Sequence, residues 1–170
     1  MDEKTEIDGE QLRVVHEGML DQGRERAWRS LISAYSVAVE RIERELSEAG
    51  LPPLAWYDVL LELSVAPGCR LRMHELARAV VMSRSGLTRL VDRLEKADLL
   101  HREPDPTDGR GSFASLTAEG ASIREKMWPI YARGIAEHFG AHVSEEEAEV
   151  IGRALGRVSA ANRTDSTRRG

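Results

Sequence analysis

The sequence holds little of several residue types that mark particular classes of protein. Its 170 residues include one cysteine, Cys69, which excludes an internal disulfide framework and fits a reducing cytoplasm. No apolar run approaches the roughly 18 residues that a membrane span requires. The N-terminal stretch is polar and acidic, unlike a secretory signal. We therefore expect a cytoplasmic protein of one domain, or of one domain with an added dimerisation layer.

Signatures of catalysis and of metal binding are missing from the sequence as well. It contains no Gly-rich phosphate loop, no nucleophile elbow and no paired carboxylates in an apolar context. Among five histidines, His138 and His142 are four residues apart, but a lone pair without cysteine or carboxylate support is a weak zinc pattern. We predict no enzymatic activity, no cofactor and no bound metal.

Positive charge is in the minority, because 24 Lys and Arg face 29 Asp and Glu and the net charge is −5. The distribution of this charge is uneven along the chain. Residues 70–110 hold nine basic and seven acidic residues, a balance of +2, whereas the rest of the chain carries −7. The asymmetry indicates one face suited to polyanions on a body that is not.

The chain is organised around the residues from Ser83 to Leu99, which have a helical pattern. Ser83 is a favourable N-cap, because its hydroxyl can accept hydrogen bonds from the first-turn N–H groups. One side of the expected helix is an apolar stripe of Leu87, Leu90, Val91 and Leu94. The opposite side combines short polar with basic side chains and consists of Arg84, Ser85, Thr88, Arg89 and Arg93. These residue types suit phosphates and base edges, although an ordinary solvated helix face would look similar.

The segments on either side of this helix favour the DNA-binding interpretation. Residues 71–82 predict a short amphipathic helix, and residues 81–83 form the short link of a helix-turn-helix. Residues 99–103 and 112–116 have the pattern of two strands, joined by the turn-rich segment 104–111. This order of elements predicts a winged helix-turn-helix, in a chain that is mainly α with a small β-wing.

With these elements in place, the chain resembles the MarR family of winged helix-turn-helix transcription regulators. The resemblance rests on the run LARAVVMSRSGLTRLVDRLEKADLLHRE and on the pattern Asp108-x-Arg110 followed by Leu116-Thr117, and it covers about residues 31–158. It implies a triangular homodimer that presents two recognition helices to a pseudo-palindromic operator in double-stranded DNA. The expected DNA contacts are Ser83, Arg84, Ser85, Thr88, Arg89, Arg93 and Arg110.

The resemblance places an Asp-x-Arg pair in the wing, and the two residues are expected to act differently. Arg110, at a projecting loop tip, is suited to the negative potential of a narrow minor groove. Asp108 would be repelled by phosphates, so we expect it to structure the wing by accepting backbone N–H bonds or by pairing with an arginine. The alternative is that both are solvated turn residues.

Long helices are expected on both sides of the DNA-binding region. They span residues 7–20, 24–49 with a stop at Gly50, 54–65, and 117–139 with a kink at Pro129, and a last helix starts at a capping box at Ser144. The predicted organisation is N-terminal dimerisation helices in 1–50, the winged helix-turn-helix in 51–116, C-terminal dimerisation helices in 117–161 and a flexible tail in 162–170. The apolar faces of the end helices favour a homodimer over a monomeric bundle.

Aromatic residues are sparse, at 5% of the chain, and they lie mostly on the long helices. In relatives of this kind a ligand cleft lies where such helices meet the DNA-binding region, and such clefts are mostly apolar. Candidate ligand-binding residues are Trp28, Tyr35, Trp56 and Asp58, with Arg133 and His16 as further polar groups. The alternative is that the aromatic side chains pack the helices and the dimer seam.

The sequence therefore predicts a DNA-binding transcription regulator, in particular a repressor released by a small effector, for which aromatic molecules are candidates. One alternative is a winged helix used for protein contacts without DNA binding. A second is a redox-sensing regulator based on Cys69, since the nearby Arg70 and Arg72 would lower the pKa of a thiol. Salt-dependent binding to duplex DNA separates the first alternative from the prediction.

Overall fold

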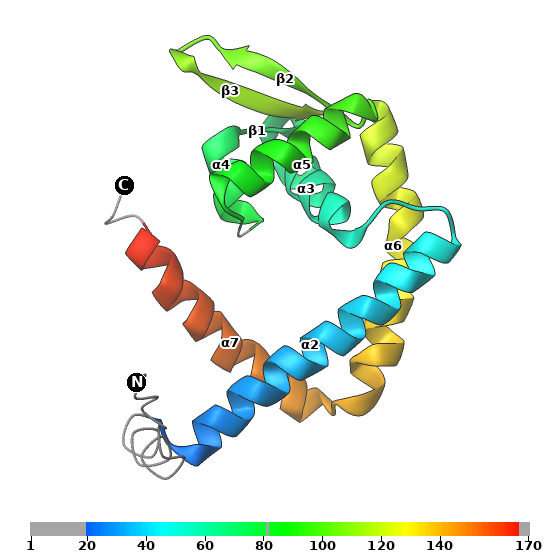
Figure 1. Ribbon diagram of the computed structural model, residues 1–170, viewed down its shortest axis with the longest axis vertical. Coiled ribbons are helices and arrows are strands. Elements are labelled where there is room, and N and C mark those ends of the chain that lie inside the picture. Colours follow the sequence, from blue (N-terminus) through cyan, green and yellow to red (C-terminus); the bar gives the residue numbers. More distant parts are fainter. Residues whose placement is uncertain (1–19, 81, 167–170) are drawn as a thin grey trace, which may run out of the picture. The chain divides into compact units, whose positions relative to one another are not determined.

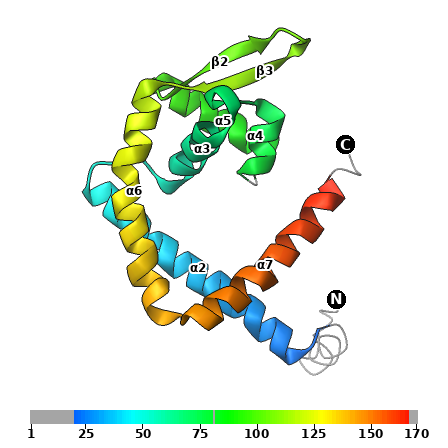
Figure 2. The same ribbon diagram turned by 180° about the vertical axis from the view of Figure 1, so that it is seen from behind.

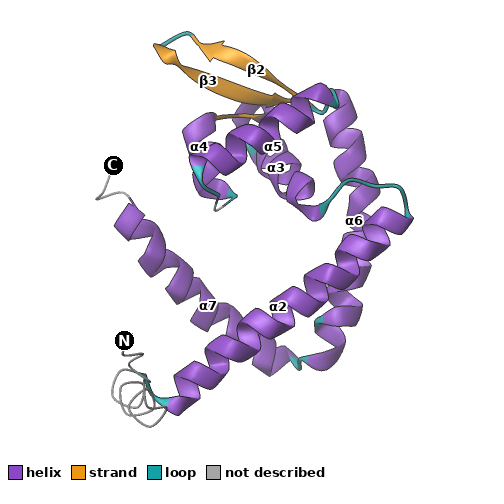
Figure 3. Ribbon diagram, viewed as in Figure 1, coloured by secondary structure: helices purple, strands orange, loops and turns teal. Residues whose placement is uncertain are grey.

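The computed structural model describes residues 20–80 and 82–166 (Figures 1 and 3). The chain divides into two compact units, residues 1–40 and residues 41–170. The described residues are mainly helical with one small antiparallel sheet, which confirms the predicted fold class. The helix predicted over residues 7–20 falls almost entirely outside the described residues. No helix of the described part is long and apolar enough to cross a membrane.

The first long helix, α2, spans Gln22–Glu48, close to the predicted range. Asp21 caps its start, because the carboxylate accepts hydrogen bonds from the N–H groups of Gly23 and Arg24. Gly50 has a φ of 69° at its end, and the Leu51 N–H donates to the Leu46 carbonyl at 2.9 Å. This left-handed glycine is the predicted C-terminal stop, since a side chain is disfavoured in that conformation.

The region predicted to bind DNA is built from α3 (Leu54–Val65), a 3₁₀ turn at Pro67–Cys69, β1 (Arg70–Arg72), α4 (Met73–Ala79) and α5 (Arg84–Lys96). Figures 1 and 2 show α3, α4 and α5 gathered against the sheet. Their facing side chains form one buried cluster of Val59, Leu60, Leu63, Leu76, Ala77, Leu87, Leu90, Val91, Leu94, Leu99, Leu100 and Ala114. The predicted stripe of α5 lies in this core, which fixes the opposite side of α5 toward solvent.

The predicted helix over residues 71–82 is wrong at its start. Residues Arg70–Arg72 form the strand β1, which pairs antiparallel with β3, and α4 begins only at Met73. The pairing partners of β1 lie about forty residues later in the chain, with Arg70 opposite Ser115 and Arg72 opposite Phe113. A strand of three residues has no periodicity of its own, so its existence depends on this distant partner.

The wing strands are longer than the sequence indicates. β2 spans Leu100–Asp105 and β3 spans Asp108–Leu116, so most of the predicted loop 104–111 is strand and the sheet order is β1-β3-β2. Pro104 is tolerated because β2 is an edge strand, where the missing N–H disrupts no second ladder. The register shifts between Pro104 and Asp105, just before the turn. The wing is therefore a hairpin with a tight tip.

The C-terminal part consists of α6 (Ala118–His138), a 3₁₀ turn at Gly140–His142 and α7 (Glu145–Ser166). Thr117 caps α6 by accepting from the Gly120 N–H at 3.0 Å, and α6 continues through Pro129. The predicted capping box is confirmed, because Ser144 and Glu147 exchange side-chain-to-backbone hydrogen bonds. α7 continues to Ser166, so the first residues of the predicted tail 162–170 are helical. The Asn162 side chain there donates to the Val158 carbonyl and remains within the helix.

Candidate nucleic-acid interface

The helix α5 presents two chemically different sides. Ser83 caps it as predicted, because its hydroxyl oxygen accepts from the Gly86 N–H at 3.1 Å. The apolar stripe is buried, with Leu87, Leu90, Val91 and Leu94 each at most 1% exposed. The predicted basic side is exposed to solvent and comprises Arg84, Ser85, Thr88, Arg89 and Arg93. The helix therefore holds these five side chains outward on a rigid, buried base.

The arginines on this side have their charges available for a ligand. Within residues 20–80 and 82–166, neither Arg84, Arg89 nor Arg93 forms an ion pair with a carboxylate. Arg89 makes only a long bond of 3.4 Å from Nε to the Ser85 carbonyl, and Thr88 donates to the Arg84 carbonyl at 2.9 Å. Unpaired guanidinium groups on an exposed helix face suit phosphates and guanine edges.

Arg102 on β2 holds the flank of α5, and sequence reasoning missed it. Its two terminal nitrogens donate to Asp92 Oδ1 at 2.5 Å and Glu95 Oε2 at 2.6 Å. Its backbone N–H also donates to Glu95, at 2.9 Å. Because these bonds join residues seven to ten positions apart on different elements, they tie β2 to the flank of α5. The positive charge of Arg102 thereby offsets the negative charges of Asp92 and Glu95 next to the basic side of α5.

The wing is structured by Asp105, another residue that the sequence analysis did not single out. Asp105 is 4% exposed and accepts from the Thr107 N–H at 2.8 Å and the Thr107 hydroxyl at 2.7 Å. It also accepts from Arg72 Nε at 2.7 Å. An Asp whose side chain bonds the backbone two residues later is the signature of an Asx-turn, and the run Asp-Pro-Thr carried that signal.

Asp108 and Arg110, the wing residues that the sequence analysis did name, both lie on β3. The hydrogen bond to Asp105 is the main reason why the pKa of Arg72 is raised. Asp108 is exposed, and its negative charge adds to this effect. The wing-structuring role of Asp108 stays a prediction. Asp105 is the wing residue whose buried contacts are established.

Acid should loosen the wing through Asp105. Hydrogen bonds from the Thr107 hydroxyl and N–H, opposed by burial and aided by Arg72, lower the pKa of Asp105 from 3.8 to about 2. Because the pKa is lower in the folded protein, the ionised group stabilises the fold fully above about pH 4, and this contribution disappears toward about pH 2. Amide protection factors in β2 and β3 should fall over that interval more than those of α3. Equal protection across the interval would show that the Asp105 charge does not hold the wing.

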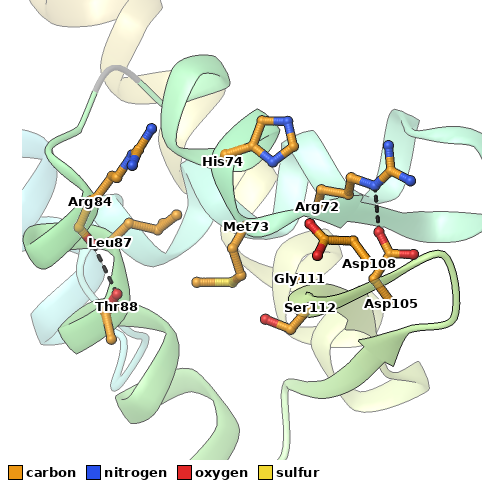
Figure 4. Close-up of a pocket in the computed structure, with 10 residues that line it drawn as sticks. All are labelled: Arg72, Met73, His74, Arg84, Leu87, Thr88, Asp105, Asp108, Gly111 and Ser112. Carbon is orange, nitrogen blue, oxygen red and sulfur yellow. Dashed lines mark hydrogen bonds and ion pairs between the residues drawn. The ribbon is translucent and has the colours of Figure 1, made fainter. Parts of the chain in front are cut away.

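A groove of about 510 Å³ separates the start of α5 from the wing (Figure 4). Figure 4 shows Arg84, Leu87 and Thr88 on one side and Arg72, Asp105 and Asp108 on the other, with Met73 between them. The lining residues are Arg72, Met73, His74, Arg84, Leu87, Thr88, Asp105, Asp108, Gly111 and Ser112. The exposed side of α5 and the wing therefore form the two walls of one concave surface.

The candidate ligand-binding residues lie on two helices. Trp28 and Tyr35 on α2 are 60% and 65% exposed. On α3, Trp56 is half-buried and packs against the core cluster, while Asp58 is exposed. Partial loss of water and the neighbouring carboxylates of Glu62 and Glu43 raise the pKa of Asp58. His16 lies outside the described residues.

Other aromatic residues pack the fold. Tyr57 is 2% exposed and makes an edge contact with Tyr131, whose ring centroid is 5.0 Å away, and Trp128 lies against both rings. These three side chains join α3 to α6. For Tyr57, Trp128 and Tyr131, packing between helices therefore accounts for their positions, as in the alternative to a ligand cleft.

His138 has carboxylate neighbours that its sequence spacing did not show. Its Nε2 lies 2.7 Å from Glu45 Oε1, and the Glu137 carboxylate is close enough to share a metal ion with both. The hydrogen bond with His138 and the charges of His138 and Arg133 lower the pKa of Glu45, against the effect of burial. Arg133 lies 3.6 Å from Glu45 Oε2, and its positive charge opposes a cation there. The group is an ion-pair network that links α2 to α6.

Comparison with known proteins gives consistent matches to one family. A model of the MarR family matches residues 49–111. The chain is 30% identical over 128 residues to the HTH-type transcriptional regulator MhqR of Bacillus subtilis. The aligned residues cover 75% of this chain and 86% of that protein. The MarR family regulator AbsC of Streptomyces coelicolor is 30% identical, with a TM-score of 0.77 over 85% of this chain and 97% of that chain. Sco3205 of the same organism, solved in complex with DNA, is 31% identical, with a TM-score of 0.77 over 84% and 89%.

Proposed function

Since the chain belongs to the MarR family and is a DNA-binding transcription regulator, we propose that it acts as a homodimeric repressor of a pseudo-palindromic operator, released by a small molecule. The observation that carries the proposal is the exposed side of α5, where Arg84, Arg89 and Arg93 lack carboxylate partners among the described residues. An α-helix fits the major groove, and this side supplies both phosphate and base contacts. The similarity to Sco3205, solved with DNA, supports this use of the fold.

The contacts divide into two kinds along the surface. Thr88, Arg89 and Arg93 lie within two turns of α5 and read the major groove, while Ser83, Arg84 and Ser85 at the helix start bind the DNA backbone. Arg110 on β3 reaches the neighbouring minor groove, whose negative potential is strongest over narrow A·T-rich stretches. The groove between α5 and the wing then faces the stretch of DNA backbone that lies between the major-groove and the minor-groove contacts.

Homodimerisation follows from the exposed apolar side chains of the end helices. Val150 and Val158 of α7 are 55% and 53% exposed, with Ile151 and Leu155 half-buried beside them. A second copy of the chain covers such faces and places two α5 helices about 34–36 Å apart, one turn of DNA. Sedimentation equilibrium checks this, since a monomeric bundle would show the mass of a single chain.

Repression is the simplest consequence of this geometry. A dimer bound across two successive major-groove half-sites occupies the duplex on one side and excludes other proteins from it. Transcription from a promoter that overlaps the operator should therefore fall when the protein is added. In vitro transcription on such a template tests the sign of regulation directly, because an activator would increase the product.

Replacing Arg89 by alanine should weaken operator binding by about 1–3 kcal/mol and relax base preference at one position in each half-site. The midpoint of thermal unfolding should hardly change, because the side chain is exposed and off the buried stripe. Lys126→Ala on α6 removes the same charge from another exposed site and serves as the control. Fluorescence anisotropy with labelled duplex measures both. Binding of Arg89→Ala within twofold of the control would remove Arg89 from the reading surface.

Planar aromatic acids are the effector class to test, and the candidate contacts are tested one residue at a time: Trp28 and Tyr35 in the first unit, and Trp56 and Asp58 in the second. Such a ligand should quench tryptophan fluorescence and weaken DNA binding over the same concentration range. Linkage requires that saturating DNA weaken the ligand by the same factor. Tyr35→Ala should lower ligand affinity and leave operator affinity unchanged. Quenching without any effect on DNA affinity would mean that the ligand is bound but does not regulate.

A further inference from the structure

At the turn of the wing the Asp105 carboxylate is nearly fully buried, although the neighbouring residues 104 and 106–108 are exposed. The side chain of Asp105 is 1% exposed, at the point where the register of β2 and β3 shifts. Its oxygens accept two hydrogen bonds from Thr107 and one from Arg72. A buried charge is tolerated only when it is paired and hydrogen-bonded in this way. The tip of the wing is thus organised around one ionised group.

The partner of this carboxylate comes from the opposite edge of the sheet. Arg72 belongs to β1, and its Nε donates to Asp105 at 2.7 Å while Nη2 donates to the Thr107 hydroxyl at 3.1 Å. Its guanidinium also lies 5.4 Å from the ring centroid of Phe113 on β3. Arg72 precedes α4 directly, and its backbone N–H donates to Glu75 within that helix. Through this one residue the wing tip is fastened to the helical body (Figure 4).

β3 passes close to the same carboxylate just after Arg110. A Cβ atom on Gly111 would lie 3.1 Å from Asp105 Cβ and 3.3 Å from Asp108 Oδ2, so glycine permits a tight approach here. The backbone on the C-terminal side of Arg110 is therefore held against Asp105. A two-stranded hairpin is only marginally stable by itself, so this contact limits how freely the tip can move.

We propose that Arg72 and Asp105 are positioning residues for DNA binding, a latch that holds the wing so that Arg110 meets the duplex. The proposal rests on the DNA-binding function above and deepens it. Neither latch residue needs to touch DNA, because each acts through the backbone that carries Arg110. The latch also explains why an acidic group is kept beside a polyanion site, where its charge alone disfavours binding.

The test uses the sign of this charge effect. Asp105→Asn removes a negative charge near DNA, so simple electrostatics predicts tighter binding, whereas the latch predicts weaker binding on the order of tenfold, about one charged contact. Asp98→Asn, at an exposed residue whose φ of 60° asparagine tolerates, removes the same charge as a control and should leave affinity unchanged or slightly higher. Arg72→Lys keeps the positive charge but loses the two-nitrogen contact, and it should behave like Asp105→Asn.

A double variant shows whether the effect passes through Arg110. Asp105→Asn combined with Arg110→Ala should bind no more weakly than Arg110→Ala alone, because the latch then has nothing to position. Independent, multiplying losses would overturn the proposal. So would tighter binding by Asp105→Asn.

A measurement without DNA separates failure of the latch from failure of the proposed function. Hydrogen exchange at Thr107 to Gly111 should be faster in both Asp105→Asn and Arg72→Lys than in the parent protein and in Asp98→Asn, with exchange in α3 unchanged. Unchanged exchange at the wing would refute the latch even if every variant binds DNA. A parent protein that binds no duplex would refute the proposed function while the exchange result still decides whether the wing is held.

Discussion

Replacing Leu90 by alanine should lower the free energy of unfolding by about 2–5 kcal/mol, the usual range for a leucine truncated in a core. Leu90 is 1% exposed and lies in the cluster that also contains Leu60 of α3 and Leu76 of α4. The truncation removes buried apolar surface and leaves a cavity that the surrounding helices fill only in part. Urea unfolding followed by far-UV circular dichroism measures the loss.

The neighbouring residue provides the control on the same helix. Arg89→Ala should change the unfolding free energy by no more than about 0.5 kcal/mol, because an exposed side chain with one long hydrogen bond contributes little. Of these two adjacent residues, Leu90 should therefore affect the free energy of unfolding, whereas Arg89 should affect DNA binding. A loss below about 1 kcal/mol for Leu90→Ala would show that α5 is not anchored as described.

Among the glycines that the structure describes, Gly120 should be the one whose replacement by alanine destabilises the fold most. A Cβ there would clash with the Leu99 carbonyl oxygen and would lie 2.9 Å from Leu116 Cδ1 and 3.0 Å from the Leu99 carbonyl carbon. Backbone atoms cannot rotate away as a flexible side chain can, so α6 must shift from the end of the wing. We expect destabilisation at or above the upper end of the about 1–3 kcal/mol typical of overpacking.

Gly152→Ala is the matched control, because a Cβ there meets no heavy atom within 4 Å among the described residues. Gly152 lies inside α7, where alanine has the better helix propensity, so this variant should gain up to about 1 kcal/mol. Thermal and urea unfolding of the two variants measure the contrast. Equal stabilities would mean that α6 does not approach Leu99 as closely as the structure shows.

The sequence predicted α5 and its two sides because all the signals lie within one segment. The N-cap at Ser83 and the spacing of Leu87, Leu90 and Leu94 depend on local geometry alone. The same holds for the capping box at Ser144 and the stop at Gly50. Local periodicity therefore fixed the orientation of the candidate DNA contacts before any tertiary structure was considered.

The residues that sequence reasoning missed are those whose partners are distant. Arg72 bonds Asp105, 33 positions away, and β1 exists only through its pairing with β3. Arg102 meets Asp92 and Glu95 because the sheet folds back over α5. The Asp-x-Arg pattern singled out Asp108, whereas the burial of Asp105 depends on the assembled sheet.

The central claim, that this chain reads duplex sequence through α5, is tested most directly by its specificity ratio. A duplex selected from random sequence by the full-length protein is compared with a shuffled duplex of the same length and composition, in a salt series. The account predicts two similar half-sites about one helical turn apart, binding about 10³-fold or more tighter to the selected duplex, and affinity that falls steeply with salt. Equal affinity for the two duplexes, or no salt-dependent binding to either, would contradict it.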